Sequence, residues 1–266
     1  MEIDNLVVAE GHAWIVCVHG DDEAMAQWQL QAYWLENRPR PSPAPAVQHV
    51  DSGWFGVLGF LAVIWAVPAL NGEVVPDLRA VGRLDAELVG AGEWWRAVTA
   101  LTLHGDIAHI VSNSFFGCIF GLFVGRYLGS GFGWLLVLAS ATAANLTNAW
   151  LQPGAFRAIG ASTATFAALG VAPAFAWRRG YFRGAGAVRG FAPIFGAIAL
   201  FSFTGFGGQN PEQIDVLGHL FGFAYGVVAG LAVANVDLRA KSTADQQRAG
   251  LVAVAVIVGA WWLAWP

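Results

Sequence analysis

Residues 215–235 read DVLGHLFGFAYGVVAGLAVAN, an apolar run that carries one histidine, His219, near its start. The run has about the 20 residues that a helix needs to cross the apolar core of a bilayer. Its glycines recur at every fourth position: Gly218, Gly222, Gly226 and Gly230. This spacing leaves one helix face without side chains, so a second helix can approach closely. We therefore expect a transmembrane helix that packs tightly against a neighbour and holds an ionisable group near one end.

The whole chain has the composition of a membrane protein. Of its 266 residues, 56% are hydrophobic and 12% are charged, whereas charged residues make up about a quarter of a soluble domain. Seven apolar runs approach the length of a bilayer crossing: 54–71, 107–127, 132–151, 161–177, 190–205, 215–235 and 249–265. The sequence predicts an all-α membrane protein. We expect Ala161, Ala164 and Ala168 of the fourth run to fit into the glycine face of the sixth.

A composition shift near residue 46 separates a small cytosolic segment, residues 1–46, which ends in a proline-rich linker, from the membrane region. Six of the apolar runs fall within residues 47–236, and residues 237–266 hold a cytosolic loop and the seventh run. Within the first region, residues 13–18 are typical of a strand, and residues 23–37 of a helix capped by Asp21 or Asp22. The long segment 72–106 carries paired tryptophans, and we expect it to lie in the outer membrane interface.

The distribution of charge sets the expected orientation and excludes some partners. Most cations fall in inside loops if the N-terminus is cytoplasmic, which places the C-terminus outside. Nearly all of them are arginine, as in GC-rich bacterial genomes, so we expect a bacterial plasma (inner) membrane and no cleaved leader. The net charge of −4 and the lack of a basic stripe argue against a nucleic-acid partner. Cys17 and Cys118 lie in unlike surroundings, so we expect no structural disulfide.

The polar residues inside the spans are few, and each needs a partner or a function because its burial in lipid is costly. In the predicted topology the second, fourth and sixth runs all begin at the outer side. His109, Ser162 and His219 lie near the starts of these runs and therefore share one depth. A helix from Ser162 to Trp177 spans about 24 Å, less than the roughly 30 Å of the bilayer core. We expect Ser162 to begin below the surface, in a protein-lined recess that holds water.

A serine and a histidine that meet in such a recess can break an acyl bond. The imidazole of His219 would accept the hydroxyl proton as the Ser162 oxygen attacks a carbonyl, and would return that proton to the leaving amine. His109, Asn113 and the backbone N–H of Ser162 would donate to the oxyanion that forms. His109 and Asn113 are four residues apart and lie on one helix face.

In their order and spacing, several short motifs resemble those of the rhomboid family of intramembrane serine proteases, over about residues 54–236. They are Trp95-Arg96, His104 followed by His109 and Asn113, Arg126 to Gly131, Gly160-Ala161-Ser162, and His219 followed by Gly222. The resemblance implies a six-helix core with a seventh C-terminal helix, a flap from Gly205 to Asp215, and no metal or cofactor. It implies substrates that are single-span membrane proteins, cut in or near the transmembrane segment. Supporting roles at the site would fall to Arg96, His104, Gly160, Phe166 and Gly222.

Three positions depart from the family pattern. Thr163 stands where glycine is usual, and it adds bulk where backbone donors should approach the scissile carbonyl. Gly218 replaces the alanine before the histidine, and Phe166 replaces a common tyrosine but could still stack on His219. The bulk of Thr163 supports an alternative, a rhomboid-like pseudoprotease that binds transmembrane helices without cutting them. A further alternative is a small transporter that uses His109 and His219.

Other readings of single residues stay open at this point. Ser162 alone could be a packing serine that bonds to its own helix. Asp215 could be a third member of a catalytic triad, but we expect it to cap the sixth helix, and Asp106 to cap the second. His104 is expected to be a structural partner in the first loop. Three polar residues of the third run are expected to bond between helices or to line a water pocket: Asn145, Thr147 and Asn148.

Overall fold

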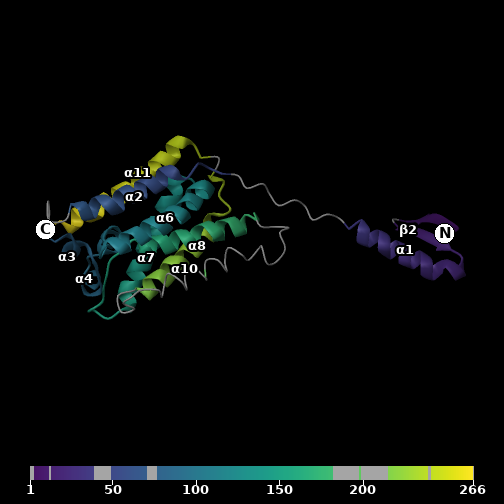
Figure 1. Ribbon diagram of the computed structural model, residues 1–266, viewed down its shortest axis with the longest axis horizontal. Coiled ribbons are helices and arrows are strands. Elements are labelled where there is room, and N and C mark those ends of the chain that lie inside the picture. The colour runs from purple at the N-terminus through teal and green to yellow at the C-terminus, as the bar shows by residue number, and fades with distance from the viewer. Residues whose placement is uncertain are drawn as a thin grey trace. The chain divides into compact units, whose positions relative to one another are not determined.

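The computed structural model describes residues 3–11, 13–38, 49–70, 77–181, 198, 215–238 and 241–265. The chain forms two compact units, Met1–Pro43 and Ala44–Pro266, and Figure 1 shows their elements. The predicted fifth span, 190–205, lies outside the described residues except for Ile198, and the predicted flap lies outside them except for Asp215. The boundaries that we predicted at residues 46 and 236 remain predictions.

The N-terminal unit is a β-hairpin followed by a helix. Strand β1 (Asn5–Glu10) pairs antiparallel with β2 (Ala13–Val18), and a 3-10 turn, η1 (Gly20–Asp22), leads into α1 (Glu23–Glu36). The sequence predicted β2, α1 and the N-cap residue Asp22, whose side chain makes no cap bond. It missed β1, where Leu6, Val7 and Val8 form a short apolar stretch that is stable as a strand only through its pairing with β2. This unit is therefore not all-helical.

The second unit is a bundle of long helices, and their positions follow the predicted apolar runs. They are α2 (Trp54–Ala69), α6 (Ile107–Leu128), α7 (Ser130–Leu151), α8 (Ser162–Arg178), α10 (Val216–Val233) and α11 (Thr243–Ala264). Among the described residues, α6, α10 and α11 are long and apolar enough to cross a bilayer, and α2 is a shorter apolar helix. The helix α11 starts before its apolar run because Ser242 and Asp245 form a capping box at its N-terminus.

The segment between α2 and α6 folds into short elements that pack on the bundle. They are α3 (Leu78–Gly82), β3 (Leu84–Asp85), α4 (Ala86–Gly90), α5 (Arg96–Thr99) and η2 (Ala100–Thr102). The buried Arg96 holds them together, because its guanidinium bonds to Glu93 at 2.6 Å and to the carbonyl oxygens of Ala80 and Arg83. Strand β3 pairs with β4 (Arg157–Ala158), which leads toward the start of α8. This first loop is therefore a folded platform beside Ser162.

The tightest packing in the bundle joins α8 to α10, which run side by side (Figure 1). A Cβ placed on Gly222, Gly226 or Gly230 would lie 2.3 to 2.5 Å from a backbone oxygen of α8. The oxygens belong to Thr163, Ala167 and Val171. The prediction that glycine would admit a close neighbour is confirmed.

The expected partners of the glycine face were wrong. We predicted Ala161, Ala164 and Ala168, whereas the residues that face the glycines are Thr163, Ala167 and Val171. Ala164 and Ala168 lie in the same buried cluster as Ala167 and Val171, together with Val124 of α6 and Val137 of α7. The contact is made by the α8 backbone, so a threonine and a valine can face the glycines. Small side chains in α8 therefore do not identify the residues that make the contact.

Replacement of Gly226 with alanine is expected to destabilise the bundle by about 1–3 kcal/mol, because the new methyl group meets the Ala167 backbone and overpacks the interface. The matched control is Gly259→Ala on α11, where no atom lies within 4 Å of the added carbon. That change should stabilise its helix by up to about 1 kcal/mol through helix propensity. Thermal unfolding in detergent measures both, and equal effects of the two substitutions would contradict the packing described here.

Candidate active site

Ser162 is the first residue of α8, and the chain enters this helix through a turn that only glycine fits. Gly160 has φ 139°, and a Cβ on it would lie 2.7 Å from two ring atoms of His109 and 3.6 Å from the Ser162 hydroxyl oxygen. The backbone N–H of Gly160 donates to the carbonyl of Ala100 at 2.9 Å. The first loop and α6 therefore hold the segment before Ser162 from two sides, and His109 lies beside the hydroxyl.

His219 approaches the same region from α10. Its imidazole is 7% exposed and stacks on the ring of Phe166, with centroids 4.5 Å apart and planes 28° apart. Phe166 lies one helical turn after Ser162, so the predicted stacking is confirmed. The buried Nδ1 of His219 has no hydrogen-bond partner among the described residues. The backbone N–H of His219 donates to the carbonyl of Asp215, which fixes the first turn of α10.

Two donors from α6 complete the polar surroundings. The His109 backbone N–H donates to the carboxylate of Asp106, which confirms Asp106 as the N-cap of this helix. Asn113 follows one turn later and is 6% exposed. Its side-chain NH2 is buried and finds no acceptor in the part of the chain that the structure describes. Because an unpaired buried donor costs about 1–3 kcal/mol, Asn113 is a costly residue for packing alone.

His104 holds the start of α8 from the first loop. Its Nε2 accepts the backbone N–H of Ala161 at 3.4 Å, and its ring meets that of His109 edge to face at 5.1 Å. Burial, with a smaller contribution from His109, lowers the pKa of His104 from 6.5 to about 3. The imidazole is therefore neutral at physiological pH and carries its proton on Nδ1. This contact agrees with the predicted structural role of His104.

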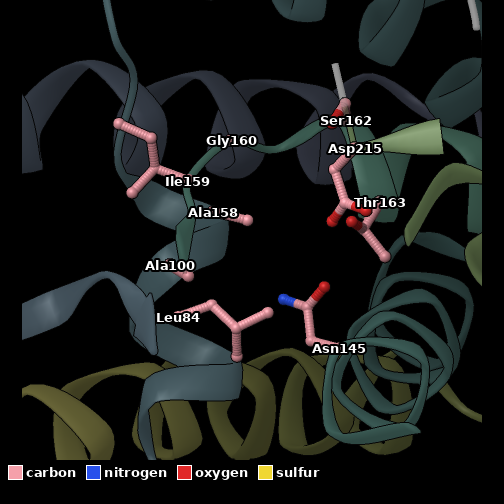
Figure 2. Close-up of a pocket in the computed structure, with 9 residues that line it drawn as sticks. All are labelled: Leu84, Ala100, Asn145, Ala158, Ile159, Gly160, Ser162, Thr163 and Asp215. Atoms are coloured by element: carbon pink, nitrogen blue, oxygen red, sulfur yellow. The ribbon is translucent and has the colours of Figure 1, made fainter. Parts of the chain in front are cut away.

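A small cavity lies next to Ser162 and has room for roughly one water molecule. Figure 2 shows polar side chains pointing into it from three elements: Asn145 of α7, Thr163 of α8 and Asp215 before α10. The carboxylate of Asp215 accepts from the Gly218 backbone at 2.8 Å and from the Asn148 amide at 2.7 and 2.9 Å. Asp215 is thus the predicted N-cap, and it also ties α10 to α7.

The structure brings most of the predicted site residues together at the N-terminal ends of α6, α8 and α10. Ser162, His109 and Gly160 are direct neighbours, and His219 stacks on Phe166 one turn below the hydroxyl. Gly222 lies against Thr163, whose methyl carbon would be 3.2 Å from a Cβ on that glycine. Arg96 lies apart from this group and acts on the first loop. No group of three or more His, Cys, Asp and Glu residues could hold a metal ion within the described residues.

Comparison with known proteins agrees with this arrangement. Residues 91–236 match the family model for the Rhomboid domain. The chain belongs to the rhomboid family. It is 36% identical over 93 residues to Rhomboid protease GluP of Bacillus subtilis (strain 168), an alignment that covers 35% of this chain and 18% of GluP. It is 28% identical over 170 residues to Putative rhomboid protease YdcA of the same organism, covering 64% of this chain and 82% of YdcA.

A plant relative extends the comparison. The chain is 32% identical over 106 residues to RHOMBOID-like protein 5 of Arabidopsis thaliana, an alignment that covers 38% of this chain and 33% of the relative. This rhomboid-family chain therefore matches less than half of GluP and of the plant protein, and most of YdcA. Family membership and the apolar helices identify an integral, multi-pass membrane protein, and they support an intramembrane protease at the level of the family.

Some residues that shape the site could not be found from the sequence. The bond of Asn148 to Asp215, and those of Asn145 to Ala97 and of Thr147 to Tyr225, are the interhelical contacts expected of these polar residues, although their partners were unknown. The close approach of Asp215 to Gly218 was not expected, since a Cβ there would lie 2.3 Å from the carboxylate. This contact explains why glycine replaces the alanine that is usual before the histidine.

The low pKa of His104 predicts an acid-sensitive fold. The unfolded chain binds a proton at His104 below about pH 6.5, whereas the folded site resists it until about pH 3, so stability should fall as the pH drops through this window. His104→Gln keeps an acceptor for Ala161 but cannot titrate, and it should reduce the slope of stability against pH between 6.5 and 3. Unfolding midpoints across this range measure the slope. An unchanged slope in His104→Gln would refute the interpretation.

Proposed function

We propose that this rhomboid-family chain is a serine endopeptidase that cleaves single-span membrane proteins in or near their transmembrane segments. Ser162 is the nucleophile and His219 the general base. The observation that carries the proposal is the imidazole of His219, buried and stacked on Phe166 one turn from the Ser162 hydroxyl. A buried ionisable side chain inside a membrane bundle needs a function to offset its cost.

The reaction proceeds in two steps. The Ser162 oxygen attacks the scissile carbonyl while its proton passes to His219, and the tetrahedral oxyanion collapses as that proton moves to the leaving amine. An acyl ester on Ser162 remains. Water then attacks this ester, His219 takes one of its protons and returns it to the Ser162 oxygen, and the acid product leaves. Each proton that the imidazole accepts is given back within the same step.

The oxyanion receives its hydrogen bonds from α6 and from the start of α8. The unpaired NH2 of Asn113 is a donor ready for this use, and the ring of His109 lies beside Gly160 at the mouth of the site. The backbone N–H of Ser162 points out of the first turn of α8, where the helix dipole favours negative charge. Donors that are fixed in place before the reaction stabilise the transition state most.

The location of the site favours a transmembrane peptide as substrate. Ser162 stands at the start of α8, among helices that belong to a membrane bundle, so the peptide must reach it from the bilayer or its interface. In the substrate, small residues and a sequence of low helix propensity would leave the scissile bond accessible at the site. We place the site near the outer face of a bacterial plasma membrane, with the N-terminus in the cytoplasm and the C-terminus outside.

The alternative of a binding-only pseudoprotease depended on the bulk of Thr163. This side chain is buried, and its methyl group lies toward Gly222 across the α8–α10 interface. The extra volume is taken up between the helices, where glycine leaves room for it. The position of Thr163 therefore supports an active enzyme over a blocked one.

Loss of the nucleophile should abolish cleavage. Ser162→Ala is expected to reduce cleavage of a model single-span substrate by at least about 10³-fold and to prevent labelling by a fluorophosphonate, because the acyl ester forms on the Ser162 hydroxyl. The matched control is Ser140→Ala on α7, whose hydroxyl bonds to the Leu136 carbonyl of its own helix. It should keep both cleavage and labelling. Labelling that survives in Ser162→Ala would refute the assignment.

Asn113 is expected to separate activity from stability. Asn113→Ala removes an oxyanion donor and should lower kcat by about 10²-fold or more, yet leave the unfolding temperature unchanged or higher because the Asn113 NH2 has no acceptor among the described residues. The control Asn145→Ala loses a bond to the Ala97 carbonyl and should be less stable. Cleavage kinetics and thermal unfolding of the two variants test this. An Asn113→Ala variant with normal kcat would remove Asn113 from the mechanism.

A further inference from the structure

Three tryptophans lie at the C-terminal end of α11, where Trp265 caps the helix. The sequence does not distinguish them, but their surroundings in the fold differ. Trp261 is partly buried against the first loop, whereas Trp262 is 82% and Trp265 51% exposed. Exposed tryptophans are ordinary at a membrane interface. The inward-facing Trp261 is therefore the one whose position needs a separate explanation.

Trp261 makes both a polar and an apolar contact with the platform formed by the first loop. Its indole N–H donates to the hydroxyl of Thr102 at 3.1 Å. Its ring packs in a cluster with the buried Leu78 and Leu103, and a Cβ on Gly82 would lie 2.4 Å from it. The same cluster includes Ile159, which belongs to the segment leading into α8. One side chain of α11 thus contacts the first loop directly and shares a cluster with the segment that leads into α8.

The contact leads to Ser162 in two short steps. Thr102 and Leu103 directly precede His104, whose Nε2 accepts the N–H of Ala161. Ile159 directly precedes Gly160, whose N–H is bonded to the Ala100 carbonyl. A shift of Trp261 would therefore move the His104 imidazole and the 159–161 segment together. The His104 imidazole and the 159–161 segment together determine the position of Ser162 at the start of α8.

The N-terminal end of α11 is fixed as well, which sets the position of Trp261 along the bundle. The Gln246 side chain accepts from the backbone N–H groups of Gly131 and Phe132, each at 3.0 Å, and donates to the Leu128 carbonyl at 3.1 Å. A Cβ on Gly131 would overlap the Gln246 backbone. These contacts lock the N-terminal turn of α11 to the junction of α6 and α7, so the helix cannot slide along the bundle.

We propose that Trp261 is a positioning residue for the site: through Thr102 and Leu103, the seventh helix holds His104 and the 159–161 segment in the arrangement that presents Ser162. The effect on turnover rests on the proposed protease function, whereas the effect on the position of this segment does not. Residues of the seventh helix do not touch the reacting groups, and their influence passes through the platform.

A mutant cycle in the full chain, solubilised in detergent, tests the proposal. Trp261→Phe keeps an aromatic ring but removes the N–H donor. Thr102→Val removes its acceptor, together with the bond that the Thr102 hydroxyl donates to the Thr99 carbonyl. The control is Trp262→Phe, at the exposed neighbour. Loss of the Trp261–Thr102 hydrogen bond in Trp261→Phe should lower kcat about fivefold without changing KM. The double variant should be no slower than Thr102→Val alone, because both changes remove the same bond.

Hydrogen exchange of residues 158–163 provides a readout that does not require activity. Faster exchange in Trp261→Phe and Thr102→Val, with no change in Trp262→Phe, supports the proposal, as does the non-additive loss of kcat. Exchange equal to wild type in Trp261→Phe overturns it, and so does an additive loss of kcat in the double variant. If the wild type cleaves no substrate, the proposed function fails, and the exchange comparison still decides whether Trp261 positions this segment.

Discussion

The contact between the glycine face of α10 and the backbone of α8 is the constraint on which the rest of the structure depends. Each of Gly222, Gly226 and Gly230 leaves room for a carbonyl oxygen of α8, and any side chain at these positions would separate the helices. Two helices brought this close place His219 of one against Phe166 of the other. The geometry of the proposed dyad is therefore a consequence of helix packing. In a membrane, where lipid and apolar side chains are alike, such packing is the main force that holds helices together.

A second constraint is the supply of polar partners. Some buried polar groups are satisfied by neighbouring helices, such as Asn145 by the Ala97 carbonyl and Asp215 by Asn148 and Gly218. Others, at the proposed site, have no partner among the described residues: the NH2 of Asn113 and the Nδ1 atoms of His104 and His219. Unpaired groups at this site are unfavourable for stability but suited to a reaction that develops charge there. The side-chain NH2 groups of Asn145 and Asn148 have acceptors among the described residues, whereas that of Asn113, which we assign to the oxyanion, has none.

Much of this arrangement could be predicted from the sequence, and the failures have physical causes. Apolar runs located the described long helices, and the spacing of aspartates before them identified the caps Asp106 and Asp215. The residues that face the glycines were predicted wrongly, because the α8 backbone makes the contact and sequence patterns report side chains. Strand β1 was missed because a short strand depends on pairing. Trp261 was indistinguishable from its neighbours because only the folded first loop gives it a partner.

The central claim is that the Ser162 hydroxyl and the His219 imidazole act on the same carbonyl. A crystal structure of the chain with a peptidyl chloromethyl ketone tests it most directly, because this reagent joins a nucleophilic serine and a histidine only when both reach one reacting centre. The account predicts a bond from the Ser162 oxygen to the carbonyl carbon, and a second bond from His219 to the adjacent methylene. Reaction at any other residue, or a His219 ring that remains outside hydrogen-bonding reach of the Ser162 oxygen, would contradict it.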